Sequence, residues 1–525
     1  MKADLVLTNA NVLTMNPAQP QAEAIAVKND KIIKVGAKED IDPWIGKNTK
    51  VISLEGKTVV PGFIDTHIHV VDFARVLTWV DLNGTKSIGD LKNRIKKRSQ
   101  HLPKEKWIIG RGWNQACFEE KRFPNRADLD EVSSDNPVVL YHQCEQICIV
   151  NSKALKLTGI TNQTSPPKNS ALDKADTGEL TGILRGDATN LVWDKIPEPN
   201  EEDLLESTSL ACEAILKAGI TSVHWIVLLP IEIQILKKLY LENRLPIRVY
   251  LIIPESLVGN VTDSGLHETS GSMLKVGGAL IFADGYLASR TAALLQPYSD
   301  DPAEKGKLLY AQEGMIKLAD RIQKAGFQLV IHAVGDKALD TALTTIEETS
   351  SNKSEKVRRN RLEQAAVLNE ELLKRMKKQQ VIVSVQPRVI ASEFSVWSAM
   401  ERLGAERAKW LFPLKTLIGN GVMVVAGSDC PMEPLSPLLG IQAAVTRDAF
   451  PEERISVDDA LRMYTVNSAY ASFEESIKGS IEVGKLSDIA VLSCDPRVVP
   501  PDKIKDITVE MTILGGRVVY PKIRM

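Results

Sequence analysis

The chain has 525 residues, and its 65 lysine and arginine residues are balanced by 67 aspartate and glutamate residues, a formal net charge of -2. This balance argues against a strongly basic nucleic-acid or membrane-surface binder as the first hypothesis. Hydrophobic residues make up 44% of the chain and charged residues 25%, which is typical of a soluble globular protein with a large core.

The sequence has no window of about 18 uncharged apolar residues, so we expect no membrane-spanning helix. Its first residues lack an apolar secretion-signal core, which runs for about 7 to 15 residues. Six cysteines occur without a Cys-x-x-Cys pair, which favours reduced thiols over a disulfide framework. We therefore predict a cytoplasmic protein that acts on a small molecule, binds neither nucleic acid nor membrane, and is able to form a homo-oligomer.

Residues 1–57 are short apolar runs separated by Asn, Asp and Gly, a pattern that predicts small antiparallel strands. Residues 479–525 have the same texture. Because the two ends of a domain often lie close together, we expect both segments to form one small composite β-sandwich domain.

Residues 58–478 alternate short apolar runs with amphipathic stretches, which predicts an α/β fold of parallel strands joined by helices. Eight strands are predicted, the number in a (β/α)8 TIM barrel. The gap between the first two, about residues 70–219, is too long for one connection and predicts an inserted subdomain. The predicted strands are Thr58–Asp65, Ile220–Ile226, Ile247–Ile253, Gly278–Ala283, Phe327–His332, Arg361–Val367, Val381–Gln386 and Val422–Gly427.

In such a barrel the chemistry lies at the carboxyl ends of the strands. The chain has seven histidines, and four of them fall at predicted strand ends: His67, His69, His224 and His332. His67 and His69 are one residue apart, so both side chains point to the same face of their strand. Imidazoles that converge on one point are common ligands of first-row metals. His332 and Asp429 would complete a mixed nitrogen and oxygen ligand set, although His-x-His alone also fits two partly buried histidines.

Several motifs resemble those of the amidohydrolase superfamily, over essentially the whole chain. The first-strand, fifth-strand and eighth-strand signatures correspond to residues 59–66 (VVPGFIDT), 327–336 (FQLVIHAVGD) and 426–437 (AGSDCPMEPLSP). Residues 479–490 (GSIEVGKLSDIA) resemble the return into the small domain. Residues 283–294 (ADGYLASRTAAL) and 150–155 (VNSKAL) are similar to the amidohydrolase 3 branch, which includes N-substituted formamide deformylases.

The resemblance implies that His67, His69, His332 and Asp429 hold one divalent metal ion, with zinc expected and iron or manganese as alternatives. It also implies hydrolysis of an amide-like, non-peptide carbon–nitrogen bond by metal-activated water, with Asp429 as general base.

The sequence departs from the family pattern at three places. The fourth-strand lysine that bridges two metals in some relatives is replaced by Leu280, which excludes such a bridge. The sixth-strand histidine is replaced by Gln364, a poor zinc ligand that we expect to orient substrate or water. The Asp-Gly-His of relatives is replaced by Cys144, Glu145 and Gln146 in the insertion.

Two interpretations remain open. In the first, one metal supports hydrolysis, Glu145 acts as an acid or base, and Gln146, His142, Gln364 and Arg290 contact the substrate. Arg290 is also a candidate partner for Asp284, whose buried carboxylate would need one. In the second, the protein is an isomerase or lyase, or a non-catalytic binding protein on the same scaffold.

Overall fold

The computed structural model describes residues 1–144, 146–168, 170–263, 265–266, 271–350 and 358–521. Contacts divide the chain into two compact units, the first made of residues 1–73 and 208–525 and the second of residues 74–207. None of the helices in these described ranges is both long and apolar enough to cross a membrane.

The first unit contains the predicted barrel, an eight-stranded parallel sheet in the order β21-β20-β19-β18-β17-β16-β15-β8. The α/β barrel fold is therefore confirmed. Its strands are β8 (Phe63–Ile68), β15 (Ile220–Ile226), β16 (Arg248–Pro254), β17 (Leu274–Phe282), β18 (Gln328–Ala333), β19 (Arg361–Gln364), β20 (Ile382–Val385) and β21 (Met423–Ala426). All residues of β8, β15, β18, β19 and β20 are buried, as expected of parallel strands covered by helices.

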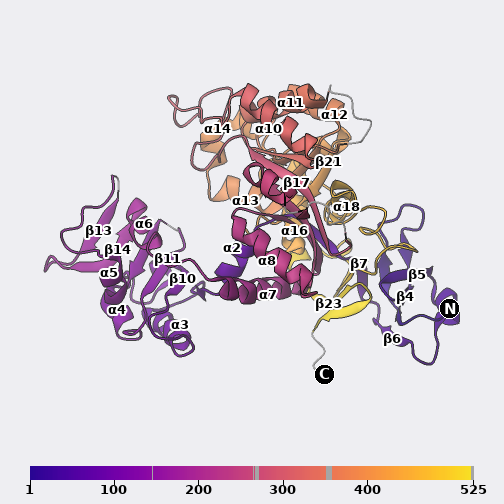
Figure 1. Cartoon of the computed structure of the whole chain (residues 1–525), viewed down its shortest axis with the longest axis horizontal. Helices are drawn as coiled ribbons and strands as arrows, with labels where there is room; N and C mark the ends of the chain where they lie inside the picture. Colours follow the sequence, from indigo (N-terminus) through magenta and orange to yellow (C-terminus); the bar gives the residue numbers. More distant parts are fainter. Residues whose placement is uncertain (145, 169, 264, 267–270, 351–357, 522–525) are drawn as a thin grey trace. The chain divides into compact units, whose positions relative to one another are not determined.

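Helices connect these strands, and α10, α11 and α12 pack against one another in sequence order (Figure 1). The helices from the end of β8 onward that lie wholly or partly in the first unit are α2 (Val70–Leu77), α7 (Glu201–Lys217), α8 (Pro230–Leu241), α9 (Val258–Asp263), α10 (Gln312–Lys324), α11 (Asp336–Ser350), α12 (Glu370–Gln379), α13 (Pro387–Ser395), α14 (Ala399–Ala408), α15 (Leu414–Gly419), α16 (Pro437–Thr446), α17 (Val457–Met463) and α18 (Val466–Ala471).

Backbone hydrogen bonds close the barrel between the end of β8 and the segment after β21. The Asp429 amide donates to the His67 carbonyl at 2.8 Å, and the His69 amide donates to the Cys430 carbonyl at 3.0 Å. A Cβ atom on Gly427 would lie 2.4 Å from the His67 backbone nitrogen, so only glycine permits this approach. Closure therefore brings two predicted site segments that are far apart in the sequence, at His67 and at Asp429, into direct contact.

Strands from both ends of the chain build two further sheets, with orders β5-β4-β1-β6 and β24-β23-β22-β7-β2-β3 in the described residues. One apolar cluster, including Leu7, Ile25, Val59, Ile489 and Ile513, joins the two sheets. In Figure 1 the strands of these sheets that come from the N-terminal part of the chain are indigo, and β23, from the C-terminal part, is yellow. The strands are β1 (Leu5–Thr8), β2 (Asn11–Leu13), β3 (Gln21–Ala22), β4 (Ala24–Lys28), β5 (Lys31–Gly36), β6 (Lys50–Ser53), β7 (Thr58–Pro61), β22 (Ile489–Leu492), β23 (Val509–Leu514) and β24 (Arg517–Tyr520), with α1 (Lys38–Ile41) after β5.

The predicted first barrel strand, Thr58–Asp65, is two strands in the structure. Residues Thr58–Pro61 form β7 of the small sheet, where they pair with β22, and the barrel strand β8 starts at Phe63. The chain crosses between the sheets at Gly62, where a Cβ atom would lie 2.3 Å from the Thr221 hydroxyl oxygen. The continuous apolar run concealed this crossing.

The second unit lies within the predicted insertion and has a six-stranded sheet in the order β13-β14-β12-β11-β10-β9. Its own apolar core includes Trp113, Phe118, Leu140 and Ile149. Its elements are β9 (Val80–Asp81), α3 (Ile88–Ser99), β10 (Ile108–Trp113), α4 (Arg126–Asp130), β11 (Val138–His142), β12 (Ile147–Val150), α5 (Ser152–Thr158), β13 (Ala171–Lys174), β14 (Leu180–Arg185) and α6 (Asn190–Trp193).

Candidate metal centre

The carboxyl ends of β8 and β21 bring three potential metal ligands together. One nitrogen each of His67 and His69 and one carboxylate oxygen of Asp429 lie within 4.8 Å of one another. Asp429 Oδ1 is 3.4 Å from His69 Nε2 and 3.6 Å from His67 Nε2. These distances leave room for an ion between the three donors, and imidazole nitrogen with carboxylate oxygen is a donor set that suits divalent first-row metals.

The charges of this cluster support one another. Burial opposes ionisation of Asp429, but the neighbouring His67 and His69 outweigh it and hold the pKa of the Asp429 carboxyl below its usual value. Burial likewise opposes protonation of His69, but its hydrogen bond to Asp429 raises the His69 pKa. Asp429 is therefore a carboxylate near neutral pH, the form that can bind a cation or accept a proton.

His332, on β18, is only 2% exposed, and neither of its ring nitrogens has a hydrogen-bond partner among the described residues. Burial, followed by the charge of His67, lowers its pKa to about 4, so the ring is neutral. Its neighbours include two aromatic rings, Phe282 at 5.1 Å and Tyr286 at 5.5 Å between centroids. A buried neutral imidazole with unpaired nitrogens is costly unless a ligand satisfies it, which fits a metal-binding role.

Strand β19 contributes a residue that the sequence reasoning did not single out. Glu363 is fully buried, and its Oε2 lies 2.6 Å from His67 Nδ1. Its other oxygen pairs with the equally buried Arg361. Burial opposes its ionisation, but Arg361 and His67 lower the Glu363 pKa overall. The sequence did contain a signal for this role of Glu363. An arginine and a glutamate lie two positions apart on a predicted strand, and buried charges need partners.

Gln364 also lies at the cluster, where its amide nitrogen donates to Asp429 Oδ2 at 3.2 Å. In the structure Gln364 thus contacts a candidate metal ligand, whereas the sequence suggested that it orients substrate or water.

Leu280 is fully buried in an apolar cluster with Ile226, Ile252 and Val330. The Leu280 side chain has no atom that can bind a metal, so it cannot bridge two metal ions.

His224 is a core residue, fully buried, with Nδ1 2.6 Å from an Arg361 nitrogen. Burial and then the Arg361 charge depress its pKa well below the usual value. It is therefore a neutral acceptor that helps to hold Arg361.

The suggested pairing of Asp284 with Arg290 is wrong. The Asp284 carboxylate accepts hydrogen bonds from the backbone amides of Ala293, Val334 and Gly335, at 2.8 to 2.9 Å. Arg290 pairs with Asp300 at 2.7 Å instead. Backbone amides therefore replace the expected cation, and Asp284 fastens the loop that carries Tyr286.

His142 and Gln146 belong to the second unit, and Glu145 lies outside the described residues. His142 Nδ1 is 2.9 Å from Cys144 Sγ, and its ring packs 4.8 Å from that of Trp113. Gln146 is exposed, and its carbonyl accepts from the Gly186 amide at 2.8 Å. Their roles in catalysis or substrate binding remain predictions.

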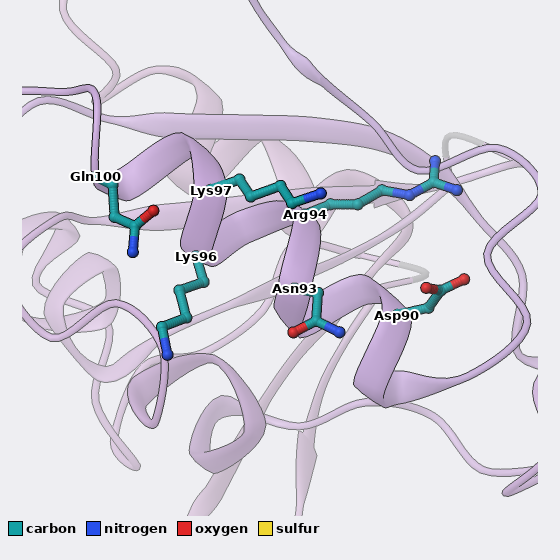
Figure 2. A pocket seen from close by; sticks show the side chains of 6 residues that line it. All are labelled: Asp90, Asn93, Arg94, Lys96, Lys97 and Gln100. Carbon is teal, nitrogen blue, oxygen red and sulfur yellow. The ribbon is translucent and has the colours of Figure 1, made fainter.

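A hollow of about 370 Å³ also lies in the second unit, along α3. Figure 2 shows the polar side chains that line it: Asp90, Asn93, Arg94, Lys96, Lys97 and Gln100. None of the predicted site residues is among them. All six come from one helix and the residue after it, so this hollow is a feature of the surface of α3.

Comparisons with known proteins bear on the family to which this chain belongs. A family model described as "Amidohydrolase family" matches residues 50–520. YtcJ of Bacillus subtilis (strain 168), which carries an amidohydrolase name, is 32% identical over 526 residues, covering 97% of this chain and 98% of that protein. The N-substituted formamide deformylase of Arthrobacter pascens is 27% identical over 540 residues, covering 99% of this chain and 98% of that protein.

A crystal structure of an uncharacterized metal-dependent hydrolase from Pyrococcus furiosus is also similar. It superimposes with a TM-score of 0.78 at 31% sequence identity, covering 94% of this chain and 99% of that chain. The match of the family model to most of the sequence, the relative above 30% identity and the shared barrel all agree: the chain belongs to the amidohydrolase family.

Proposed function

We propose that this protein is a metal-dependent hydrolase that cleaves the carbon–nitrogen bond of a small, amide-like, non-peptide substrate. The observation that carries the proposal is the convergence of one side-chain atom each of His67, His69 and Asp429 within 4.8 Å at the carboxyl ends of the barrel strands. The family membership supports a hydrolytic role. The name of the Arthrobacter pascens relative makes N-substituted formamides the first substrates to test.

His67, His69, His332 and Asp429 would hold one divalent ion, for which zinc is our first choice and iron or manganese the alternatives. When bound, such an ion polarises a substrate carbonyl and lowers the pKa of water. The apolar surroundings of Leu280 support one ion over a lysine-bridged pair.

In the proposed reaction Asp429 moves the proton. Its carboxylate, kept ionised by His67 and His69, takes a proton from the attacking water and returns it to the nitrogen of the leaving amine. Gln364 holds Oδ2 of this carboxylate, which leaves Oδ1 facing the two histidines. Tyr286, whose ring lies beside His332, supplies an aromatic surface for the substrate at this end of the barrel.

The first experiment is elemental analysis of protein purified without chelators or nickel resin. We expect about one equivalent of zinc, iron or manganese, and loss of this metal in the double variant His67→Ala, His69→Ala. The metal-loaded protein is then assayed for release of amine and formate from formanilide and N-butylformamide. A protein that binds no metal, even after zinc is added, would exclude this mechanism and favour an altered chemistry or a binding role.

A further inference from the structure

The end of strand β19 contacts the candidate metal centre through two consecutive side chains. Glu363 Oε2 is 2.6 Å from His67 Nδ1, and Gln364 Nε2 is 3.2 Å from Asp429 Oδ2. On a regular strand, consecutive side chains point to opposite faces. Two neighbours of one strand can therefore reach the same cluster only if the backbone changes direction between them.

The backbone does change direction there. Gln364 has a φ of 68° and the next residue, Ala365, a φ of 46°. Residues other than glycine rarely adopt this left-handed region, because Cβ crowds the backbone. Two such residues in a row, where a barrel strand meets a candidate active site, indicate that the arrangement is kept for the contacts it makes.

The Glu363 carboxylate is held at both of its oxygens. One faces His67, and the other pairs with Arg361; both Glu363 and Arg361 have fully buried side chains. Arg361 is in turn fixed by the Thr66 carbonyl, the Ser384 hydroxyl and His224. Glu363 therefore has little freedom, which is what a group that aims another side chain requires.

We propose that Glu363 and Gln364 are paired positioning residues of the metal centre. Glu363 accepts the Nδ1 proton of His67 and so directs Nε2 toward Asp429 and the ion. Gln364 donates to Oδ2 of Asp429 and so directs Oδ1 toward the same point. The inference rests on the proposed metal site and extends it: the Gln364 amide orients a ligand of the ion and does not itself bind the ion.

The test compares metal binding in E363Q, E363D and a matched control. The control is D488N, which breaks another nine-tenths-buried arginine–carboxylate pair, Arg248–Asp488, away from the histidines. Zinc affinity is measured by chelator competition, and the ligand field by the visible absorption spectrum of the cobalt(II) protein. Thermal unfolding of the metal-free variants reports stability separately.

We expect E363Q to weaken zinc binding by roughly 10- to 100-fold and to change the cobalt spectrum. E363D keeps the charge beside Arg361 with a shorter side chain, so it should fold and show an intermediate affinity. D488N should unfold at a lower temperature with unchanged zinc affinity. Unchanged affinity and spectrum in both E363Q and E363D would overturn the role of Glu363, as would an equal loss of affinity in D488N.

Gln364 is tested by Q364L, which removes the donor at similar volume. We expect an altered cobalt spectrum at the same metal stoichiometry and, with formanilide, a lower kcat at unchanged KM. A higher KM with an unchanged spectrum would instead make Gln364 a substrate-binding residue. Failure of the wild-type protein to bind metal would overturn the proposed function itself, whereas wild-type binding with unaffected variants would overturn only this inference.

Discussion

The two ends of the barrel strands differ in how their buried polar side chains are paired. At the amino ends, Arg248 bonds both carboxylate oxygens of Asp488, at 2.5 and 2.9 Å, and the Gln328 amide makes three hydrogen bonds of 2.8 to 3.1 Å. At the carboxyl ends, His332 and the fully buried Gln386 leave both of their polar side-chain atoms unpaired within the described ranges.

This difference separates stability from function. A buried polar group that lacks a partner costs about 1–3 kcal/mol of folding stability. Arg248 and Gln328 avoid that cost, whereas His332 and Gln386 accept it and keep polar atoms available for a ligand. Substitutions at the two ends should therefore have opposite consequences for unfolding and for metal binding or turnover.

The largest effect is expected at the carboxyl end, from Asp429→Asn. The amide cannot carry a proton between water and the leaving amine, so kcat should fall roughly 10²- to 10⁴-fold. Turnover of formanilide by metal-loaded protein measures this, with circular dichroism to verify the fold. Turnover within a few-fold of wild type would assign the proton transfer to another residue.

Asp488→Asn should lower the stability of the fold and leave metal binding unchanged. It leaves the Arg248 guanidinium buried without its carboxylate, which typically costs about 3–5 kcal/mol of unfolding free energy. Urea denaturation gives this value, and elemental analysis should find the metal content of the wild type. Loss of metal in this variant would mean that the two ends of the barrel are energetically coupled.

The two buried glutamines offer a direct comparison. Gln328→Leu removes one partner from three hydrogen bonds and should lower the unfolding free energy by about 1–3 kcal/mol. Gln386→Leu removes an amide that has no partner among the described residues, so it should leave stability equal or higher. If urea denaturation shows similar losses of unfolding free energy in both variants, the Gln386 amide has a hydrogen-bond partner in solution, for instance a buried water molecule.

The smallest effect concerns pH. Burial raises the pKa of Glu393, on α13 after β20, to about 7, above the 4.5 of the free side chain. Its contribution to stability is therefore complete below pH 4.5 and is lost as pH rises through 7. Between pH 6 and 8 this loss amounts to about 1 kcal/mol. Glu393→Gln should show a correspondingly flatter pH dependence of unfolding, and parallel curves for the two proteins would disprove the assignment.

Much of the barrel followed from local pattern. The predicted strand Ile220–Ile226 coincides with β15, and the strand ends located His67, His69, His332 and Asp429, because parallel strands align their carboxyl ends. The pattern failed where two strands adjoin without a polar break, at Gly62. It also failed for Arg290, since alternation along a strand says nothing about which group a following loop will contact.

The sequence by itself determined the alternation of strands and helices, the residue types at each strand end and the family resemblance, because each depends on residues close together in the chain. Only the tertiary structure decided the partners. His67 and Glu363 are 296 positions apart, and Gln364 reaches Asp429 through a left-handed backbone turn that no propensity favours. Such contacts form when barrel closure brings distant strands together, and spacing along the sequence does not record that geometry.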